Sequence, residues 1–293
     1  LKNYGMKKWY EIFSSRQLLV HLTYAEKFNE VKEKWLKEND KEFAKAVCVY
    51  GAIVFDTCVD YNSILTSWDS TRKKIAHVFA VQAYAFKTSY SEWNQLVEGS
   101  AYEWVIDKVA TCVKELVRYI PEKTNSIQIT CSDAASLKLE DKSIEAVIVD
   151  PPYYNNVMYA EISNFFYVWL KRLVGDLFPG LFDSELTNNV DEAVANSSLY
   201  KDVDSPKDAA NQHYQSKMKA CFTEMNRVLK DDGIMTVMFT HKKSEAWSEL
   251  TQALMDSGFT FRASWPVFTE PGQKFGKADK GVLKVMILLI CRK

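Results

Sequence analysis

An aspartate, two prolines and a tyrosine follow directly after a run of apolar residues. The run is AVIV (146–149), and the four residues after it are Asp150, Pro151, Pro152 and Tyr153. Proline lacks a backbone N–H and cannot continue a strand ladder, so a strand over this run must end here. In open parallel sheets, ligands bind at the carboxyl ends of the strands. The four residues therefore offer a carboxylate, a backbone carbonyl and a flat ring to one ligand.

This combination suits an amine on a heteroaromatic ring, such as N6 of adenine or N4 of cytosine. Because its lone pair is delocalised into the ring, such a nitrogen is a poor nucleophile. The Asp150 carboxylate and the Pro151 carbonyl could accept hydrogen bonds from its two hydrogens and favour a pyramidal nitrogen that points at a methyl sulfonium. Tyr153 could stack on the base, which must first be flipped out of a duplex. The alternative is a strand-ending turn with no chemistry.

The first 120 residues carry the pattern of a helical region. They contain three glycines and no proline, and so few chain breakers over such a length favour helices. Ser14 and Ser15 are candidate caps for the first helix. Apolar residues at steps of three or four predict further helices over 46–58 and 104–116, and a stripe of the same kind comprises Ile75, Phe79 and Ala83.

After Pro121 the pattern changes to alternating strands and helices, which indicates an α/β domain over 121–293. Short apolar runs predict strands near 127–130, 146–150, 234–240, 259–265 and 283–290. Helical stripes predict helices near 158–173, 208–229 and 244–257. Asp231, Asp232 and Gly233 predict a turn before the third of these strands. Residues 174–207 are irregular, and so long a loop is either functional or disordered.

The composition argues against several classes of protein. The net charge of −1 lacks the excess of positive charge that is typical of nucleic-acid-binding domains. Local basic patches are possible at Lys242 and Lys243 and in the set Lys274, Lys277, Lys280 and Lys284, with ordinary solvated lysines as the alternative. The six cysteines form no C-x-x-C pair, so we expect no metal site. The longest apolar run, 285–290, is too short to span a bilayer, so we expect no membrane partner and a cytoplasmic protein.

The D-P-P-Y motif at a strand end resembles that of the amino-methyltransferases, which methylate adenine N6 or cytosine N4 in DNA. Residues 150–182 are similar to one branch, the large adenine-specific DNA methylases that carry a Zn-ribbon insertion. Further segments fall in the order expected of that branch: FSSRQLL, VDYNSILTSW, SDAASLKLEDKSIEAVIVDPPYY, RVLKDDGIMTVMFTHK and SWPVFTE. The resemblance covers most of the chain. It implies a Rossmann-like methyltransferase sheet, S-adenosylmethionine as cofactor and DNA as partner, with adenine N6 as the first choice of target; cytosine N4 and RNA stay open.

The resemblance also implies roles for individual residues. The catalytic set would be Asp150, Pro151, Pro152 and Tyr153. The cofactor would be held by Asp133, Ala134 and Asp150, although a turn cap is the alternative for Asp133. Contacts to the base or to DNA would come from Tyr154, Asn156, Tyr159, His241 and Arg16, with a structural histidine as the alternative for His241.

Two short motifs near the amino terminus have no role that follows from the residues themselves. Phe13, Arg16 and Gln17 in FSSRQ match a family motif, and helix capping would explain its serines but not Arg16 and Gln17. Glu92 and Asn94 lie where the family has an acidic-x-Asn-Pro element, but this chain lacks the proline.

The chain lacks the glycine-rich loop that the family places after its first strand. It contains no G-x-G, and it also lacks the Zn-ribbon cysteines. The family's sheet has the strand order 3-2-1-4-5-7-6, and the five predicted strands would be numbers 3 to 7, which leaves an open edge. Either another chain or segment supplies the missing half, or residues 46–56 and 78–86 supply unrecognised strands, or the sheet is smaller than predicted.

Two other functions compete with catalysis. A non-catalytic or conditional subunit of a split methylase would bind DNA or a partner and keep D-P-P-Y as a half-site, and the missing glycine loop favours it. A nucleotide-binding α/β domain of another kind would need a P-loop or a G-x-G-x-x-G motif, and neither occurs.

Overall fold

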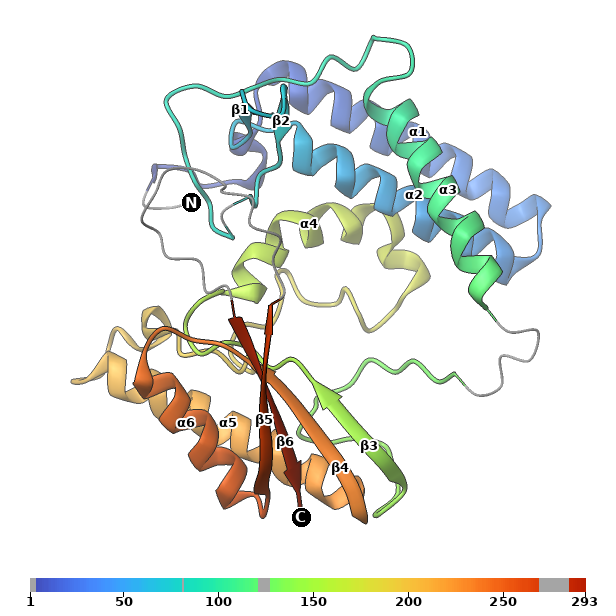
Figure 1. Cartoon of the computed structure of the whole chain (residues 1–293). Coiled ribbons are helices and arrows are strands. Elements are labelled where there is room, and N and C mark those ends of the chain that lie inside the picture. The colour runs from blue at the N-terminus through green and yellow to red at the C-terminus, as the bar shows by residue number, and fades with distance from the viewer. Residues whose placement is uncertain (1–3, 81, 121–126, 269–284) are drawn as a thin grey trace. The chain divides into compact units, whose positions relative to one another are not determined.

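The computed structural model describes residues 4–80, 82–120, 127–268 and 285–293 (Figure 1). Its contacts divide the chain into two compact units. One comprises Leu1–Gln128 and Tyr159–Asn189, and the other comprises Ile129–Met158 and Val190–Lys293. Residues 159–189, expected in the α/β domain, therefore belong with the N-terminal helices.

Four helices make up most of the first unit: α1 (Ser15–Glu38), α2 (Lys41–Tyr61), α3 (Ala101–Tyr119) and α4 (Tyr159–Val174). All four form where helical spacing of apolar residues predicts them. The unit also contains the 3-10 helices η2 (Trp9–Ile12) and η3 (Gly175–Leu177), and a hairpin of β1 (Ser67–Asp69) and β2 (Lys74–Ala76). Because residues 46–56 lie in α2, they supply no strand to a sheet.

The prediction of a helix that contains Ile75, Phe79 and Ala83 is wrong. Ile75 lies in β2, and the other two residues lie in turns or bends. The Asp69 side chain accepts hydrogen bonds from two following backbone N–H groups at 3.0 and 3.1 Å, so the chain turns back as a hairpin. The described residues of 78–86 also contain no strand, and Val81 lies outside the described residues.

An aromatic core joins the helices of the first unit. Phe13, Phe55, Phe165 and Trp169 are all buried. The Phe13 ring centroid lies 5.9 Å from that of Phe165 and 5.7 Å from that of Trp169, and Phe55 lies 5.1 Å from Trp169. Ring pairs at such distances stabilise a core beyond the effect of their buried area. The residues just before α1 therefore pack together with helices α2 and α4.

The second unit is built on a mixed sheet of four strands in its described residues: β3 (Ile144–Val149), β4 (Leu229–Phe239), β5 (Thr260–Phe268) and β6 (Val285–Arg292). Their order is β3-β4-β6-β5. β3 pairs parallel with β4, whereas β6 pairs antiparallel with both β4 and β5. Two helices, α5 (Pro206–Val228) and α6 (Ser244–Asp256), complete the unit, and the helices and strands together confirm an α/β fold class.

Two predictions about this sheet are wrong. Residues 127–130 form no strand, and Ile127 and Ile129 are 58% and 92% exposed. A strand needs a hydrogen-bonding neighbour, and no described strand pairs with this segment. The turn expected at 231–233 lies instead within β4, where Ile144 pairs with Leu229 but Ala146 pairs with Ile234. The extra residues of β4 interrupt its register with β3, and turn-forming residues tolerate such an irregularity well.

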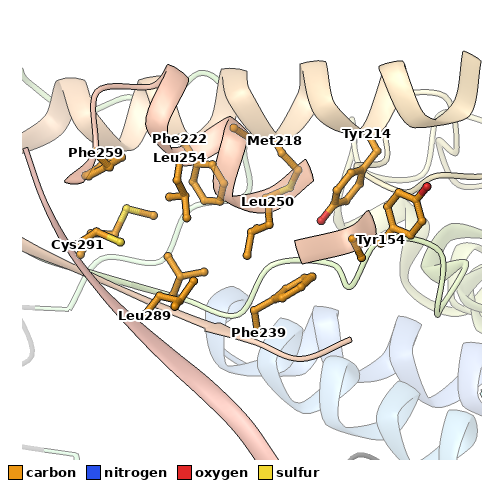
Figure 2. Packing of buried hydrophobic residues seen from close by; sticks show 14 of the residues in the cluster. Tyr154, Tyr214, Met218, Phe222, Phe239, Leu250, Leu254, Phe259, Leu289 and Cys291 are labelled. Atoms are coloured by element: carbon orange, nitrogen blue, oxygen red, sulfur yellow. The ribbon is translucent and has the colours of Figure 1, made fainter. Parts of the chain in front are cut away.

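One face of the sheet is covered by α5 and α6, and the other carries exposed apolar residues. Phe222 of α5, Leu250 of α6 and Phe239 of β4 are fully buried in one cluster on the covered face (Figure 2). Side chains alternate along a strand, so Ile148 and Trp265 point to the other face. Ile148 is 80% exposed and Trp265 is 64% exposed. Sheets with parallel strands are usually covered on both faces, so this face is unusual.

Residues 174–207 are largely irregular, as predicted. They contain η3 and one further 3-10 helix, η4 (Ser197–Tyr200). Among the helices of the described residues, none combines the length and the apolar character needed to cross a membrane. The basic set at 274–284 lies outside the described residues.

Candidate functional site

Asp150 stands at the carboxyl end of β3, as predicted, and its side chain is exposed. Pro151 follows as a buried residue. No described residue donates a hydrogen bond to the Asp150 carboxylate or to the Pro151 carbonyl. Two strong acceptors are therefore adjacent in the chain at the end of β3, which is an edge strand among the described strands, and both retain their capacity to bind a donor.

The next carbonyl, of Pro152, is used differently. It accepts hydrogen bonds from the Tyr214 hydroxyl and from the Tyr154 N–H, both at 3.0 Å. The half-buried Tyr153 ring packs edge-on against Phe239, with centroids 5.3 Å apart and planes at 74°. This contact occupies part of the Tyr153 ring, and the stacking role expected of the ring stays a prediction. These contacts hold the chain at Pro152 and Tyr153 in one conformation.

Tyr154 is a buried part of the core rather than an exposed contact residue. It is 1% exposed, and its hydroxyl donates to Asn211 Oδ1 at 2.5 Å. Its ring packs edge-on against Tyr214 and His241 at 5.3 and 5.8 Å. Its φ of 57° lies in the left-handed region, which is costly for a residue with a side chain. Because its ring is covered, Tyr154 does not present the surface that the predicted base contact requires.

His241 and Asn156, both expected to contact the substrate, lie together. Asn156 follows β3 and His241 follows β4, so the carboxyl ends of two parallel strands bring them side by side. His241 Nδ1 accepts a hydrogen bond from the Lys243 N–H at 3.1 Å, which leaves Nε2–H to donate to Asn156 Oδ1 at 3.0 Å. Burial lowers the pKa of His241, since an imidazolium would lose its hydration, and the nearby charge of Lys243 acts in the same direction.

The residues expected to hold the cofactor lie in a turn. Asp133 and Ala134 are exposed, and Asp133 Oδ1 accepts a hydrogen bond from the Ala135 N–H at 2.9 Å. The Asp133 carbonyl also accepts from the Ser136 N–H at 3.0 Å. This is the capping role that was the alternative for Asp133. Its second carboxylate oxygen keeps its capacity to accept hydrogen bonds.

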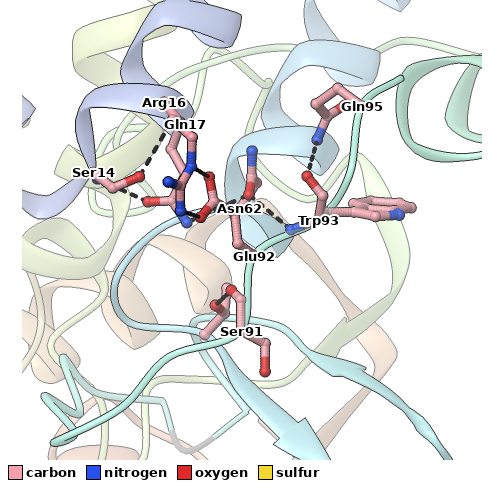
Figure 3. A network of polar contacts seen from close by, with 9 residues as sticks. Ser14, Arg16, Gln17, Asn62, Ser91, Glu92, Trp93 and Gln95 are labelled. Atoms are coloured by element: carbon pink, nitrogen blue, oxygen red, sulfur yellow. Dashed lines mark hydrogen bonds and ion pairs between the residues drawn. The ribbon is translucent and has the colours of Figure 1, made fainter. Parts of the chain in front are cut away.

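The amino-terminal motif forms a polar network in the first unit (Figure 3). The Ser14 side chain accepts from the Gln17 N–H at 3.2 Å, and Gln17 Oε1 accepts from the Ser14 N–H at 2.9 Å. This is a capping box, so capping explains Gln17 as well as the serine. The fully buried Gln17 also donates to Asn62 Oδ1 at 3.4 Å.

Arg16 joins the two short motifs that the sequence left without a role. Its guanidinium donates two hydrogen bonds to the Glu92 carboxylate, at 3.2 and 2.7 Å. Asn94 Oδ1 accepts from the Leu96 N–H at 3.0 Å and closes a local turn. The Arg16 side chain remains 81% exposed. Tyr159, at the start of α4, is also exposed.

The sequence did not single out the residues of α5 that support the motif. Asn211 and Tyr214 lie three positions apart, which places them on one helix face toward the Pro152 region. The sequence signal that could have identified Asn211 and Tyr214 is their helical spacing beside the apolar stripe of α5. The described residues contain no group of three metal-binding side chains. No family model matches this chain, and the search of curated proteins found no match either.

Proposed function

We propose that this chain is the catalytic part of an S-adenosylmethionine-dependent DNA amino-methyltransferase that acts on a flipped base, with adenine N6 as the first choice. One observation carries the proposal. The Asp150 carboxylate and the Pro151 carbonyl are adjacent and accept no hydrogen bond from any described residue, whereas the Pro152 carbonyl accepts two. The two acceptors that the chemistry needs are the two that the structure leaves available.

The chain's own residues would act on the base by positioning. Asp150 and Pro151 would each accept one hydrogen bond from the exocyclic amine, which favours a pyramidal nitrogen whose lone pair is no longer delocalised into the ring. The bound cofactor would supply an electrophilic methyl group. Loss of one proton from the nitrogen then restores a neutral amine, and Asp150 is the adjacent carboxylate that could take it. Tyr153 would contact the base with the part of its ring that is not packed on Phe239.

The sheet supports the proposal through its strand order. The observed order β3-β4-β6-β5, with β6 antiparallel to both neighbours, agrees with the order 4-5-7-6 that the resemblance implies for the second half of a methyltransferase sheet. The β3 strand then corresponds to strand 4, which carries the D-P-P-Y motif. A Rossmann-like fold is thus part of the proposal, and so is the expected cytoplasmic location.

The cofactor site would be incomplete in this chain alone. Asp133 and Ala134 offer a carboxylate oxygen and backbone groups, but the sequence contains no glycine-rich turn. Among the described strands, β3 has a neighbour on one side only, and the exposed Ile148 lies on it. We therefore include in the proposal a second chain or segment that pairs with β3 and supplies the glycine-rich loop.

The same open edge favours a second candidate function. A non-catalytic or conditional subunit would also leave β3 free for a partner and would keep D-P-P-Y without using it. The two candidates differ in the role of Asp150, because only a catalytic subunit needs its carboxylate for methyl transfer.

The test is methyl transfer from labelled S-adenosylmethionine to genomic DNA, with the modified base identified by mass spectrometry. It should be run with the chain alone and with the partner that completes its sheet. We expect N6-methyladenine, and we expect Asp150→Ala to lower the rate at least about 100-fold. Asp202→Ala, which removes an exposed carboxylate of the same unit, should keep the rate within about twofold. Equal rates for wild type and Asp150→Ala would refute the catalytic assignment.

A second measurement needs no cofactor. Duplex DNA with 2-aminopurine at a mismatched position becomes more fluorescent when that base is flipped out. We expect the wild-type chain to increase the fluorescence and Asp150→Ala to increase it less. If the chain leaves the fluorescence unchanged and methylates no DNA, the proposed function is wrong.

A further inference from the structure

The first unit contains a cavity that the proposed function does not use. Its volume is about 630 Å³, and it lies between α2, α4 and the segment 180–188. Cavities of this size are typical of sites for small organic ligands. All of its lining residues belong to the first unit, so its geometry depends on that unit alone.

Aromatic side chains form much of the cavity wall. Phe166 and Tyr167 come from α4, and Phe182 comes from the segment that follows it. The rings of Tyr167 and Phe182 lie 5.3 Å apart with their planes at 31°. The Tyr167 hydroxyl donates to the Ser184 carbonyl at 2.8 Å, which holds this part of the wall in place. Such a wall favours a flat ring over a flexible chain.

Most polar groups of the wall already have partners inside the protein. The Ser163 hydroxyl donates to the Tyr159 carbonyl at 2.7 Å, and the Thr187 hydroxyl donates to the Ala160 carbonyl at 2.7 Å. Asp183 Oδ1 accepts from the Gly180 N–H at 3.3 Å. The Thr187 bond holds the segment 180–188 against α4, whereas the other two bonds are local to α4 and to the segment. All three bonds leave these groups less capacity for a ligand.

Asp56 of α2 is the exception. Its Oδ1 atom is buried and has no hydrogen-bond partner among the described residues. A buried polar atom without a partner costs about 1–3 kcal/mol, so such an atom needs an explanation. Burial, and then the nearby charge of Asp60, raise the pKa of Asp56 to about 8. At neutral pH the side chain is therefore mostly a neutral carboxylic acid, with one donor and one acceptor.

We propose that this cavity binds a flat amino-heteroaromatic ring, whose adjacent amine and ring nitrogen pair with the Asp56 side chain. The Asp56 carboxyl group would turn toward the cavity, which it lines, and bring the buried Oδ1 into reach of the ligand. The amine then donates to the carbonyl oxygen of the acid, and the ring nitrogen accepts from its O–H. Both hydrogen bonds form without burying a net charge. The ring faces contact the aromatic wall. An alkylammonium ion fits less well, because it needs an ionised carboxylate and offers no flat face.

The test is calorimetric titration of adenine, cytosine and benzylamine into the full chain at neutral pH. We expect saturable binding of adenine or cytosine, and weaker binding of benzylamine. Asp56→Leu should weaken the binding of the base by at least about tenfold. Asp56→Asn should retain most of it, since an amide also offers one donor and one acceptor. Asp183→Asn changes another carboxylate of the wall and should bind within about twofold of wild type.

Several outcomes would overturn this proposal. They are the absence of saturable binding for both bases, equal binding by Asp56→Leu, or a preference for benzylamine that Asp56→Asn abolishes. Asp56→Leu removes an unpaired buried carboxyl, so its melting temperature should not fall below that of wild type, and loss of binding then reports the site itself. Asp150→Ala should bind the free base normally, which separates this cavity from the proposed methylation site.

Discussion

At the residue scale, the pair of His241 and Asn156 constrains the loop after β3. His241 is buried, and each of its ring nitrogens has one partner: Nδ1 accepts from the Lys243 N–H, and Nε2–H donates to Asn156. The side chain thus ties the loop after β3 to the loop after β4. It acts by positioning, and the Asp150 region depends on where that loop lies.

Asn156→Ala should lower the free energy of unfolding by about 1–3 kcal/mol, because it leaves the His241 Nε2–H buried without an acceptor. Urea unfolding of the full chain measures this difference. The neighbouring Asn155 is exposed and has no hydrogen-bond partner among the described residues, so Asn155→Ala is a matched control and should change stability by less than about 0.5 kcal/mol. Equal effects of the two substitutions would show that the His241 contact does not hold the loop.

At the element scale, patterns within one segment were sufficient for α2, α4, α5 and α6, since each has a long apolar stripe at helical spacing. Such patterns were not sufficient for residues 127–130, because a strand depends on a neighbour that the segment itself does not encode. The same distinction applies to the candidate site, where local patterns predict some features and not others. The ends of β3 and β4 were predictable, and so was the place of Asp150, whereas the burial of Tyr154 depends on partners far along the chain.

The contacts of His21 join three elements of the first unit. This residue of α1 is fully buried, and its ring nitrogens lie 3.0 Å from the Tyr102 hydroxyl of α3 and 2.9 Å from the Asn62 carbonyl, just after α2. Burial lowers the pKa of His21 to about 4. The charged form would lose its hydration in this site, so the folded protein keeps the ring neutral.

The buried His21 makes stability depend on pH. As the pH falls below about 6.5, the unfolded chain takes up a proton on this residue before the folded chain does. Stability should therefore fall between about pH 6.5 and 4, by at most about 3 kcal/mol, with no further loss from this residue below pH 4. Urea unfolding across this range measures the slope.

The contribution of His21 must be separated from that of Asp56. The pKa of Asp56 is raised on folding to about 8, so its effect has the opposite sign, and stability falls as the pH rises from about 4 to 8. The informative quantity is the difference between wild type and His21→Gln. If both proteins show the same slope between about pH 4 and 6.5, His21 does not titrate as its burial predicts.

At the scale of the whole molecule, the sheet of the second unit ends at β3 among the described strands, and one face of the sheet bears the exposed Ile148 and Trp265. In the proposed fold the missing strands and the glycine-rich loop would lie beyond the edge formed by β3. The sequence contains no segment with the pattern of that loop, and no described segment pairs with the free edge of β3. Under the proposed function, the open edge and the missing motif have one explanation, which is that a further chain or segment completes the cofactor site.

This explanation predicts that the chain alone binds S-adenosylmethionine weakly. Calorimetric titration into the folded chain, with folding shown by a cooperative unfolding transition, should give no binding in the micromolar range. Without the glycine-rich loop, few backbone groups can approach the cofactor closely. Micromolar binding that Asp133→Ala weakens would show instead that the described residues build a complete pocket, and the open edge of β3 would then have no part in cofactor binding. Binding unaffected by Asp133→Ala would place the cofactor elsewhere on the chain and would also contradict the role proposed for that turn.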